Sequence, residues 1–177
     1  FHINERAYYE KALDMSSIYA CNFKCDFVPY PIPPIGKVEA GLLTMTDYQV
    51  ESAKRIKLAE SFSWPIKTCN LKRCMLETRI PIEGTDKELV LINFHLEAYD
   101  SGEGKKIQSR MLADKLQEEY KAGNYVIAGG DLINNLKVWI HMKSMILTVG
   151  YRELCIKKIC RKDLILLWQI MRQPAVC

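Results

Sequence analysis

The sequence predicts an α/β (α+β) fold in which helices cover the outside of a mixed sheet, and three observations lead to this prediction. Two short apolar runs rich in β-branched residues, 88–96 and 124–131, have the length and composition of buried strands. Between them, residues 105–121 carry apolar side chains at helical spacing. Several further strand-like segments precede this strand–helix–strand unit, which is typical of a mixed sheet flanked by helices.

The first expected element is a helix over residues 4–15. Asn4 is suited to cap its first turn, because the side chain of Asn can accept a hydrogen bond from a free backbone N–H group. Tyr8, Ala12 and Met15 fall on one stripe of this helix, which we expect to be its buried side.

Strands are expected between this helix and the 88–96 run. Three prolines within residues 30–37 exclude a helix or a central strand, so this segment is a loop. Residues 50–58 favour neither state, and residues 83–86 form a turn that leads into the 88–96 strand. The expected strands cover residues 17–23, 41–45 and 70–80.

A second helix, over residues 105–121, links the two apolar runs. Gly123 is placed to end it, since glycine commonly follows the last helical turn. Its apolar face is expected to comprise Ile107, Met111, Leu112 and Leu116, with charged residues opposite.

Composition favours one domain in a reducing compartment. The 177 residues are 49% hydrophobic, enough for a core, and no run approaches the ~18 apolar residues of a membrane span. Seven cysteines, an odd number without a CxxC motif, favour reduced thiols and hence the cytoplasm. We interpret Cys21 and Cys25 as small hydrophobic residues rather than as a metal site.

The net charge of +4 is unevenly distributed. Residues 1–131 contain 17 Lys and Arg against 19 Asp and Glu, whereas residues 132–177 contain 8 against 2. A basic tail can indicate a nucleic-acid partner. Its lysines are scattered and its aromatic residues few, so this function ranks last among those considered.

Both apolar runs deliver a polar residue that can carry chemistry. His95 follows Asn93 at the end of the first run, and Asp131 follows a Gly-Gly pair at the end of the second. Strand ends combine a rigid support with access to solvent, so functional groups collect there. A histidine in this place can also be a satisfied structural residue, and an aspartate can simply cap a turn.

These residues resemble a known family. The run Asn93-Phe94-His95-Leu96, a helix bearing Gln108, and the run Val126-Ile127-Ala128-Gly129-Gly130-Asp131 are similar, in order and spacing, to the endonuclease/exonuclease/phosphatase superfamily of DNase I-like phosphoesterases. The resemblance covers about residues 1–131. It implies a four-layer sandwich of two mixed β-sheets flanked by helices, here truncated. It also implies hydrolysis of phosphodiesters or phosphomonoesters with Mg²⁺ or Mn²⁺.

The resemblance assigns roles to particular residues. His95 takes a phosphate-contacting or general-acid position, and Asp131 orients the nucleophile or helps to bind the metal. Arg73, Asn93 and Asn134 are candidates for substrate binding, because guanidinium and amide groups hold phosphate oxygens. Gln108 is expected to pack or to position the His95 segment. An arginine in this position is more often a surface or ion-pair residue, and Asn93 is also consistent with a hydrogen bond to a neighbouring loop.

Three departures from the family pattern predict weak or no activity. No segment before His95 supplies the early Glu that binds metal, and because Phe1 is not a natural start, we expect the chain to begin after it. The Asn of the G-D-x-N loop comes one position late, at Asn134. The closing Asp-His pair is missing, since His141 has no Asp before it. Each lost catalytic group typically lowers the rate by orders of magnitude.

Residues 132–177 are a divergent tail beyond the partial family domain 1–131. A coding run for Asp-Phe-Asn reads Asp-Leu-Ile when one T is lost, which is the order at residues 131–133. We therefore interpret the tail as read out of frame, an idea that an intact coding frame on resequencing would contradict. Within the tail, residues 163–171 are apolar enough for a helix or a buried strand.

Two functions remain open at this stage. The first is a metal-dependent phosphoesterase fragment, acting on a phosphate-ester substrate that includes nucleic acid among its alternatives. The second is a non-catalytic domain that keeps the fold and binds phosphate or nucleic acid without turnover. The substrate is set by loops that sequence patterns do not read.

Overall fold

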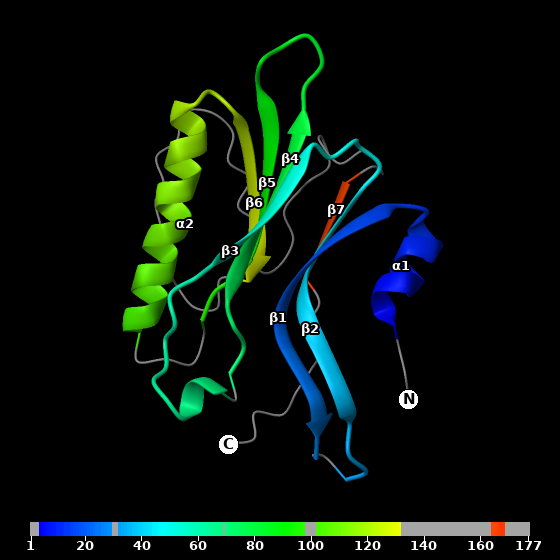
Figure 1. Ribbon diagram of the computed structural model, residues 1–177. Coiled ribbons are helices and arrows are strands. Elements are labelled where there is room, and N and C mark those ends of the chain that lie inside the picture. The colour runs from blue at the N-terminus through cyan, green and yellow to red at the C-terminus, as the bar shows by residue number, and fades with distance from the viewer. Residues whose placement is uncertain (1–3, 30–31, 69, 98–101, 132–163, 169–177) are drawn as a thin grey trace.

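The computed structural model describes residues 4–29, 32–68, 70–97, 102–131 and 164–168, which form two sheets and two α-helices (Figure 1). In chain order the elements are α1 (Glu5–Leu13), β1 (Ser16–Val28), β2 (Gly36–Thr46), β3 (Ser52–Lys57), the 3₁₀ turn η1 (Ile66–Thr68), β4 (Cys74–Pro81), β5 (Glu88–His95), α2 (Glu103–Lys121), β6 (Tyr125–Asp131) and β7 (Leu164–Trp168). No α-helix in this part of the chain is both long and apolar enough to cross a membrane.

Sheet 1 consists of β1, β2 and β7, in that order, and all of its described pairs are antiparallel. β7 comes from the tail and pairs with β2, with Leu43 opposite Leu167. The apolar segment 163–171 therefore supplies a strand, one of the two states expected. The resemblance implied that both sheets are mixed, and for the described strands of sheet 1 that expectation is wrong.

Sheet 2 has the order β3-β4-β5-β6 and is mixed. β3, β4 and β5 are antiparallel neighbours, whereas β5 and β6 are parallel and joined by α2. A parallel pair needs such a crossover, because its second strand must start again at the same end of the sheet. The strand–helix–strand unit expected from the sequence is thus confirmed, and residues 50–58, which the sequence left open, contain β3.

The elements stack in the order α1, sheet 1, sheet 2, α2 (Figure 1). One face of sheet 2 packs on α2, where Phe94 and Leu116 belong to the largest buried cluster. Its other face meets sheet 1 through Leu42 and Leu76, and the outer face of sheet 1 meets α1. Sheet 2 is therefore covered on both faces at β5, which explains the continuous apolar run of this strand.

The helices confirm the Asn4 cap and the end of α2 before Gly123, but α1 ends at Leu13 rather than at Met15, because Asp14 adopts a left-handed conformation (φ 52°). The Asn4 side chain accepts a hydrogen bond from the N–H of Ala7 (3.1 Å), and Gly123 follows α2 with φ +81°. The expected helix faces are also corrected. The Tyr8 stripe is wrong, because Tyr9 packs on sheet 1 while Tyr8 is exposed. Ile107 is exposed as well, since α2 turns its Gln108 side toward the sheet.

Candidate functional site

The candidate site lies at the edge of sheet 2 where β5 and β6 end together. The parallel register pairs His95 with Asp131, and the N–H of Leu96 donates to the Asp131 carbonyl oxygen (3.4 Å). The strands approach so closely here that a Cβ atom at Gly130 would overlap the Phe94 carbonyl oxygen, so the residue before Asp131 must be glycine. The two predicted catalytic residues therefore end neighbouring strands.

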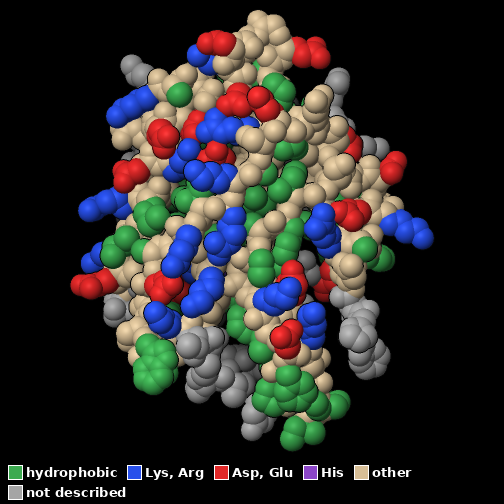
Figure 2. Space-filling model, in the orientation of Figure 1, with side chains coloured by type: hydrophobic (Ala, Val, Ile, Leu, Met, Phe, Trp, Pro, Cys, Tyr) green, Lys and Arg blue, Asp and Glu red, His purple; other side chains and the backbone are tan. Residues whose placement is uncertain are grey.

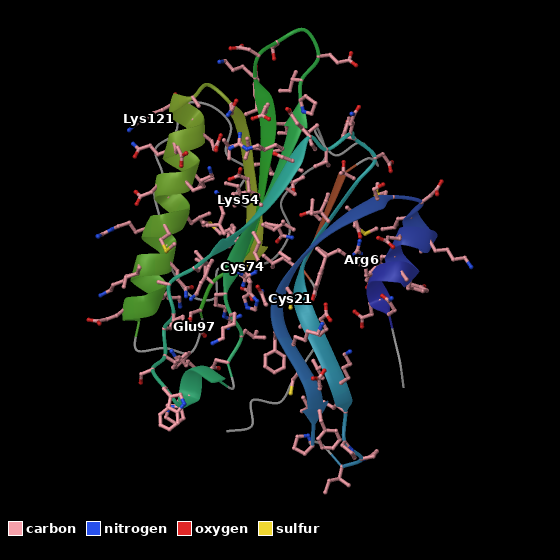
Figure 3. All side chains as sticks on the ribbon, viewed as in Figure 1. Arg6, Cys21, Lys54, Cys74, Glu97 and Lys121 are labelled. Atoms are coloured by element: carbon pink, nitrogen blue, oxygen red, sulfur yellow. The ribbon has the colours of Figure 1, made fainter. Side chains whose placement is uncertain are left out.

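Arg73 reaches the same edge from the start of β4. Its Nε and Nη2 atoms donate to the two carboxylate oxygens of Glu97, each at 3.1 Å. Its Nη1 atom lies 2.9 Å from Nδ1 of His95 and also contacts Nε2. Glu97 is labelled in Figure 3 near the start of β4, which Cys74 marks. A bidentate pair of this kind holds the guanidinium plane in one orientation.

The His95 ring is held in its neutral form. Arg73, His95 and Glu97, which we call the Arg73 cluster, are all buried, and His95 is 9% exposed. Burial, and then the charge of Arg73, lower the pKa of His95 to about 3, although the Glu97 carboxylate acts in the opposite direction. At neutral pH the ring can accept or donate a hydrogen bond but carries no proton to give as an imidazolium.

Asp131 shares the electrostatic surroundings of this cluster. Burial raises the pKa of its carboxyl group, while the charges of Arg73 and Lys105 act to lower it. The side chain is half-buried, so it remains accessible at the end of β6. Arg73, His95 and Asp131 are thus brought to one place from three strand ends, although they lie far apart in the sequence.

Gln108 of α2 positions the segment that follows His95, as the sequence led us to expect. Its carbonyl oxygen accepts a hydrogen bond from the N–H of Glu97 (2.8 Å). Its amide donates to the Ala59 carbonyl oxygen (2.8 Å) and to Oγ of Ser61 (3.2 Å). The side chain is fully buried. Gln108 therefore fixes Glu97, and through Glu97 the orientation of Arg73.

Asn93 is placed inside the sandwich rather than at its edge. Its amide nitrogen donates to the Leu43 carbonyl oxygen (3.0 Å), a bond between the two sheets, and the residue is 1% exposed. It supports the site by holding β5 against β2, and substrate contact by Asn93 stays a prediction. Asn134, the third predicted substrate-binding residue, lies outside the described residues.

Glu97 is the residue that sequence reasoning missed. It follows His95 by two positions, and this spacing places alternate residues of an extended segment on the same side. That alternation was the available signal, but a carboxylate two residues after a strand end has no distinctive pattern of its own. Its role depends on Arg73, whose position no local pattern reveals.

The described residues do not provide a set of metal ligands. Nowhere in the described ranges do three or more His, Cys, Asp or Glu side chains gather so as to hold a metal ion. Asp131 supplies carboxylate oxygens, while both oxygens of Glu97 bind Arg73. Mg²⁺ prefers several oxygen ligands, and Asp131 alone does not supply them. The Mg²⁺ or Mn²⁺ site implied at Asp131 therefore stays a prediction.

Comparison with known proteins adds no relative to this picture. The chain matches no protein-family model, no curated protein and no solved structure. Its chemistry therefore has to be argued from the site itself: a buried guanidinium, a neutral imidazole and an accessible carboxyl group at the ends of three adjacent strands.

Proposed function

We propose that this domain binds a phosphoester at the edge of sheet 2 and hydrolyses it, as a partial DNase I-like phosphoesterase. The observation that carries the proposal is the meeting of Arg73, His95 and Asp131 at that edge. The stacking of two sheets between two helices, the order of the motifs and the placement of Gln108 also support it.

Each residue has a distinct task in the proposed chemistry. Arg73 attracts the phosphate oxygens, on which negative charge accumulates during displacement. A bound phosphate also offsets the charge of Arg73, which is one of the causes that lower the pKa of His95. The ring then becomes more basic and can form a charged hydrogen bond to the phosphate or the leaving oxygen. Asp131 orients the attacking water.

The described residues do not form a complete Mg²⁺ site, so no step of this proposal passes through a metal. When bound, such an ion would lower the pKa of the attacking water and neutralise phosphate charge. The proposal requires only that Asp131 face the reacting group. The dependence on added metal is then a result of the experiment.

The test is hydrolysis of bis-(p-nitrophenyl) phosphate and p-nitrophenyl phosphate with Mg²⁺ or Mn²⁺. We expect slow turnover that falls by about a hundredfold or more in His95→Ala and Asp131→Ala. Asp114→Ala, which removes an exposed carboxylate on α2, is the matched control and should keep the native rate. Equal rates in all four chains would refute the proposed site.

A second function is favoured by one specific observation. The neutral state of His95 suits a hydrogen bond to a bound phosphate better than proton transfer. A non-catalytic phosphate-binding domain would bind inorganic phosphate, lose this binding in Arg73→Met, and show no turnover above the His95→Ala background.

A further inference from the structure

A pocket beside the candidate site is lined by four basic side chains and one acidic side chain. It is a shallow hollow, partly open to solvent, between the end of β3, η1 and the start of β4. The charged lining residues are Lys57, Glu60, Lys67, Lys72 and Arg73. Arg73 belongs to both places, so the pocket adjoins the site already described.

The charges of this pocket are only partly balanced. Nζ of Lys57 lies 2.8 Å from Glu60 and Nζ of Lys67 lies 3.6 Å from it, so two lysines share one carboxylate. Nζ of Lys72 donates to the Lys67 carbonyl oxygen (2.9 Å), which carries no net charge. A hydrogen bond from Lys57, with the nearby lysine charges, lowers the pKa of Glu60, so the carboxylate stays ionised and an excess of positive charge remains.

The excess continues along the neighbouring strand. β3 adds the exposed residues Lys54 and Arg55, and Figure 2 shows Lys and Arg side chains gathered over this part of the molecule. Basic side chains on an edge strand hinder pairing with a strand of another chain, which accounts for Lys54. This role does not account for a pocket in which Lys57 and Lys67 share one carboxylate next to a buried arginine.

We propose that this pocket binds a second phosphate group, next to the phosphoester that faces Arg73 and His95. The ligand is then a molecule with two phosphates in close succession, such as a single nucleic-acid strand or a small bisphosphate. The identity of the neighbouring group rests on the proposed function. The binding of an anion in the pocket does not, because it requires no turnover.

The test measures binding by the full 177-residue chain with a metal chelator present, and chromatography of each sample afterwards checks that the ligand is still intact. Calorimetry compares a nucleoside 3′,5′-bisphosphate, the corresponding 5′-monophosphate and a short oligothymidylate. The double variant Lys57→Gln/Lys67→Gln removes two charges from the pocket. The control Lys11→Gln/Lys121→Gln removes two exposed charges from α1 and α2, so the net charge of the two variants is equal.

We expect the native chain to bind the bisphosphate more tightly than the monophosphate, and the pocket variant to lose about tenfold in affinity while the control changes by less than about twofold. The same loss confined to the oligothymidylate supports the pocket with a nucleic-acid strand as its ligand. An equal loss in both double variants, or no binding by the native chain, overturns the proposal.

Two further measurements separate the possible failures. His95→Ala should lower turnover by about a hundredfold or more and leave pocket binding in place. If the native chain binds the bisphosphate in the pocket but does not hydrolyse the nitrophenyl phosphates with Mg²⁺ or Mn²⁺, the enzyme proposal is overturned and the pocket proposal stands. If circular dichroism shows that the pocket variant does not fold, the proposal is tested instead by NMR, from the changes in amide chemical shifts of the native chain when inorganic phosphate is added. Shifts within residues 57–73 support the pocket, and shifts elsewhere only overturn it.

Discussion

Two ionic clusters, one buried and one partly buried, occupy opposite ends of sheet 2, and both use β4 together with α2. At the candidate site, Arg73 binds Glu97 and lies against His95, while Gln108 of α2 holds Glu97 in place. At the other end, Arg79 of β4 and Lys115 of α2 lie among the carboxylates Glu77, Glu88 and Glu119. The two clusters differ in whether any member can still change its charge.

The Arg79 cluster is saturated with ion pairs. Arg79 donates to Glu77 (2.7 Å) and Glu88 (2.6 Å) and also pairs with Glu119. Lys115 lies 2.9 Å from Glu77 and 2.6 Å from Glu119. Burial alone would raise the pKa of Glu119, but its bonds to Lys115, Asn124 and Arg79 lower it. The charged side chains of this cluster are therefore paired with one another, as expected of a structural network.

The Arg73 cluster contains a titratable group, His95, whose pKa is far from its ordinary value. His95 is neutral there because of burial and the charge of Arg73, and burial raises the pKa of nearby Asp131. We expect an arriving anion to raise the pKa of both groups, because nearby negative charge favours their protonated forms. Buried charge alone thus does not mark a functional site. A titratable group held away from its ordinary pKa, at an accessible strand end, is the better mark.

The largest effect on stability is expected from Arg79→Met. This change leaves Glu77 and Glu119 with Lys115 as their shared cation and removes the guanidinium that pairs with Glu88, so the free energy of unfolding should fall by about 3–5 kcal/mol. Urea denaturation measures the loss. Phosphate binding by the variant, where it still folds, should remain native. A loss of under about 1 kcal/mol would mean that the cluster is solvated rather than buried.

Arg73→Met should cost less, about 2 kcal/mol at neutral pH. Without the Arg73 charge the pKa of His95 rises, and the imidazolium can then replace the lost cation beside Glu97. The stability difference from the native chain should therefore narrow as the pH falls toward about 5.5. Urea denaturation across this pH range, with an NMR titration of His95, checks both statements. A pH-independent difference would refute the compensation.

The order of elements could be predicted from the sequence because it depends on local signals. The cap at Asn4, the prolines near residue 33, the apolar run of β5 and Gly123 after α2 each act within a few residues. Helix faces were harder. Ile107 fits an apolar stripe, but Gln108 makes bonds to two separate segments and turns the helix accordingly.

The candidate site could be predicted only in part, for a similar reason. His95 and Asp131 end apolar strands, a pattern visible in the sequence, and the parallel register then joins them. Glu97 and the lysine pocket depend on which strands become neighbours. The near-balanced charge of residues 1–131 also averages over β3, where Lys54, Arg55 and Lys57 are concentrated.

The smallest of these effects, about 1.5 kcal/mol, is expected in the pH dependence of the native chain. The unfolded chain, with an ordinary imidazole, takes up a proton near pH 6.5, whereas folded His95 does so only near its lowered pKa of about 3. Acid therefore favours unfolding, and stability is lost as the pH falls from about 6.5 to about 5. Asp131, with its raised pKa, acts in the opposite sense and limits this window at its acidic end.

The contribution of His95 is isolated by comparison with His95→Gln. His2 and His141 are present in both chains, so their titration cancels in the difference between the two stability profiles. The free energy of unfolding should change more steeply with pH in the native chain than in His95→Gln. The difference in slope corresponds to the uptake of up to one proton on unfolding, because His95→Gln has no imidazole at this position to protonate. Parallel profiles would mean that burial and the charge of Arg73 do not hold the ring neutral. The two ends of sheet 2 would then differ in composition but not in their ability to respond to an anion.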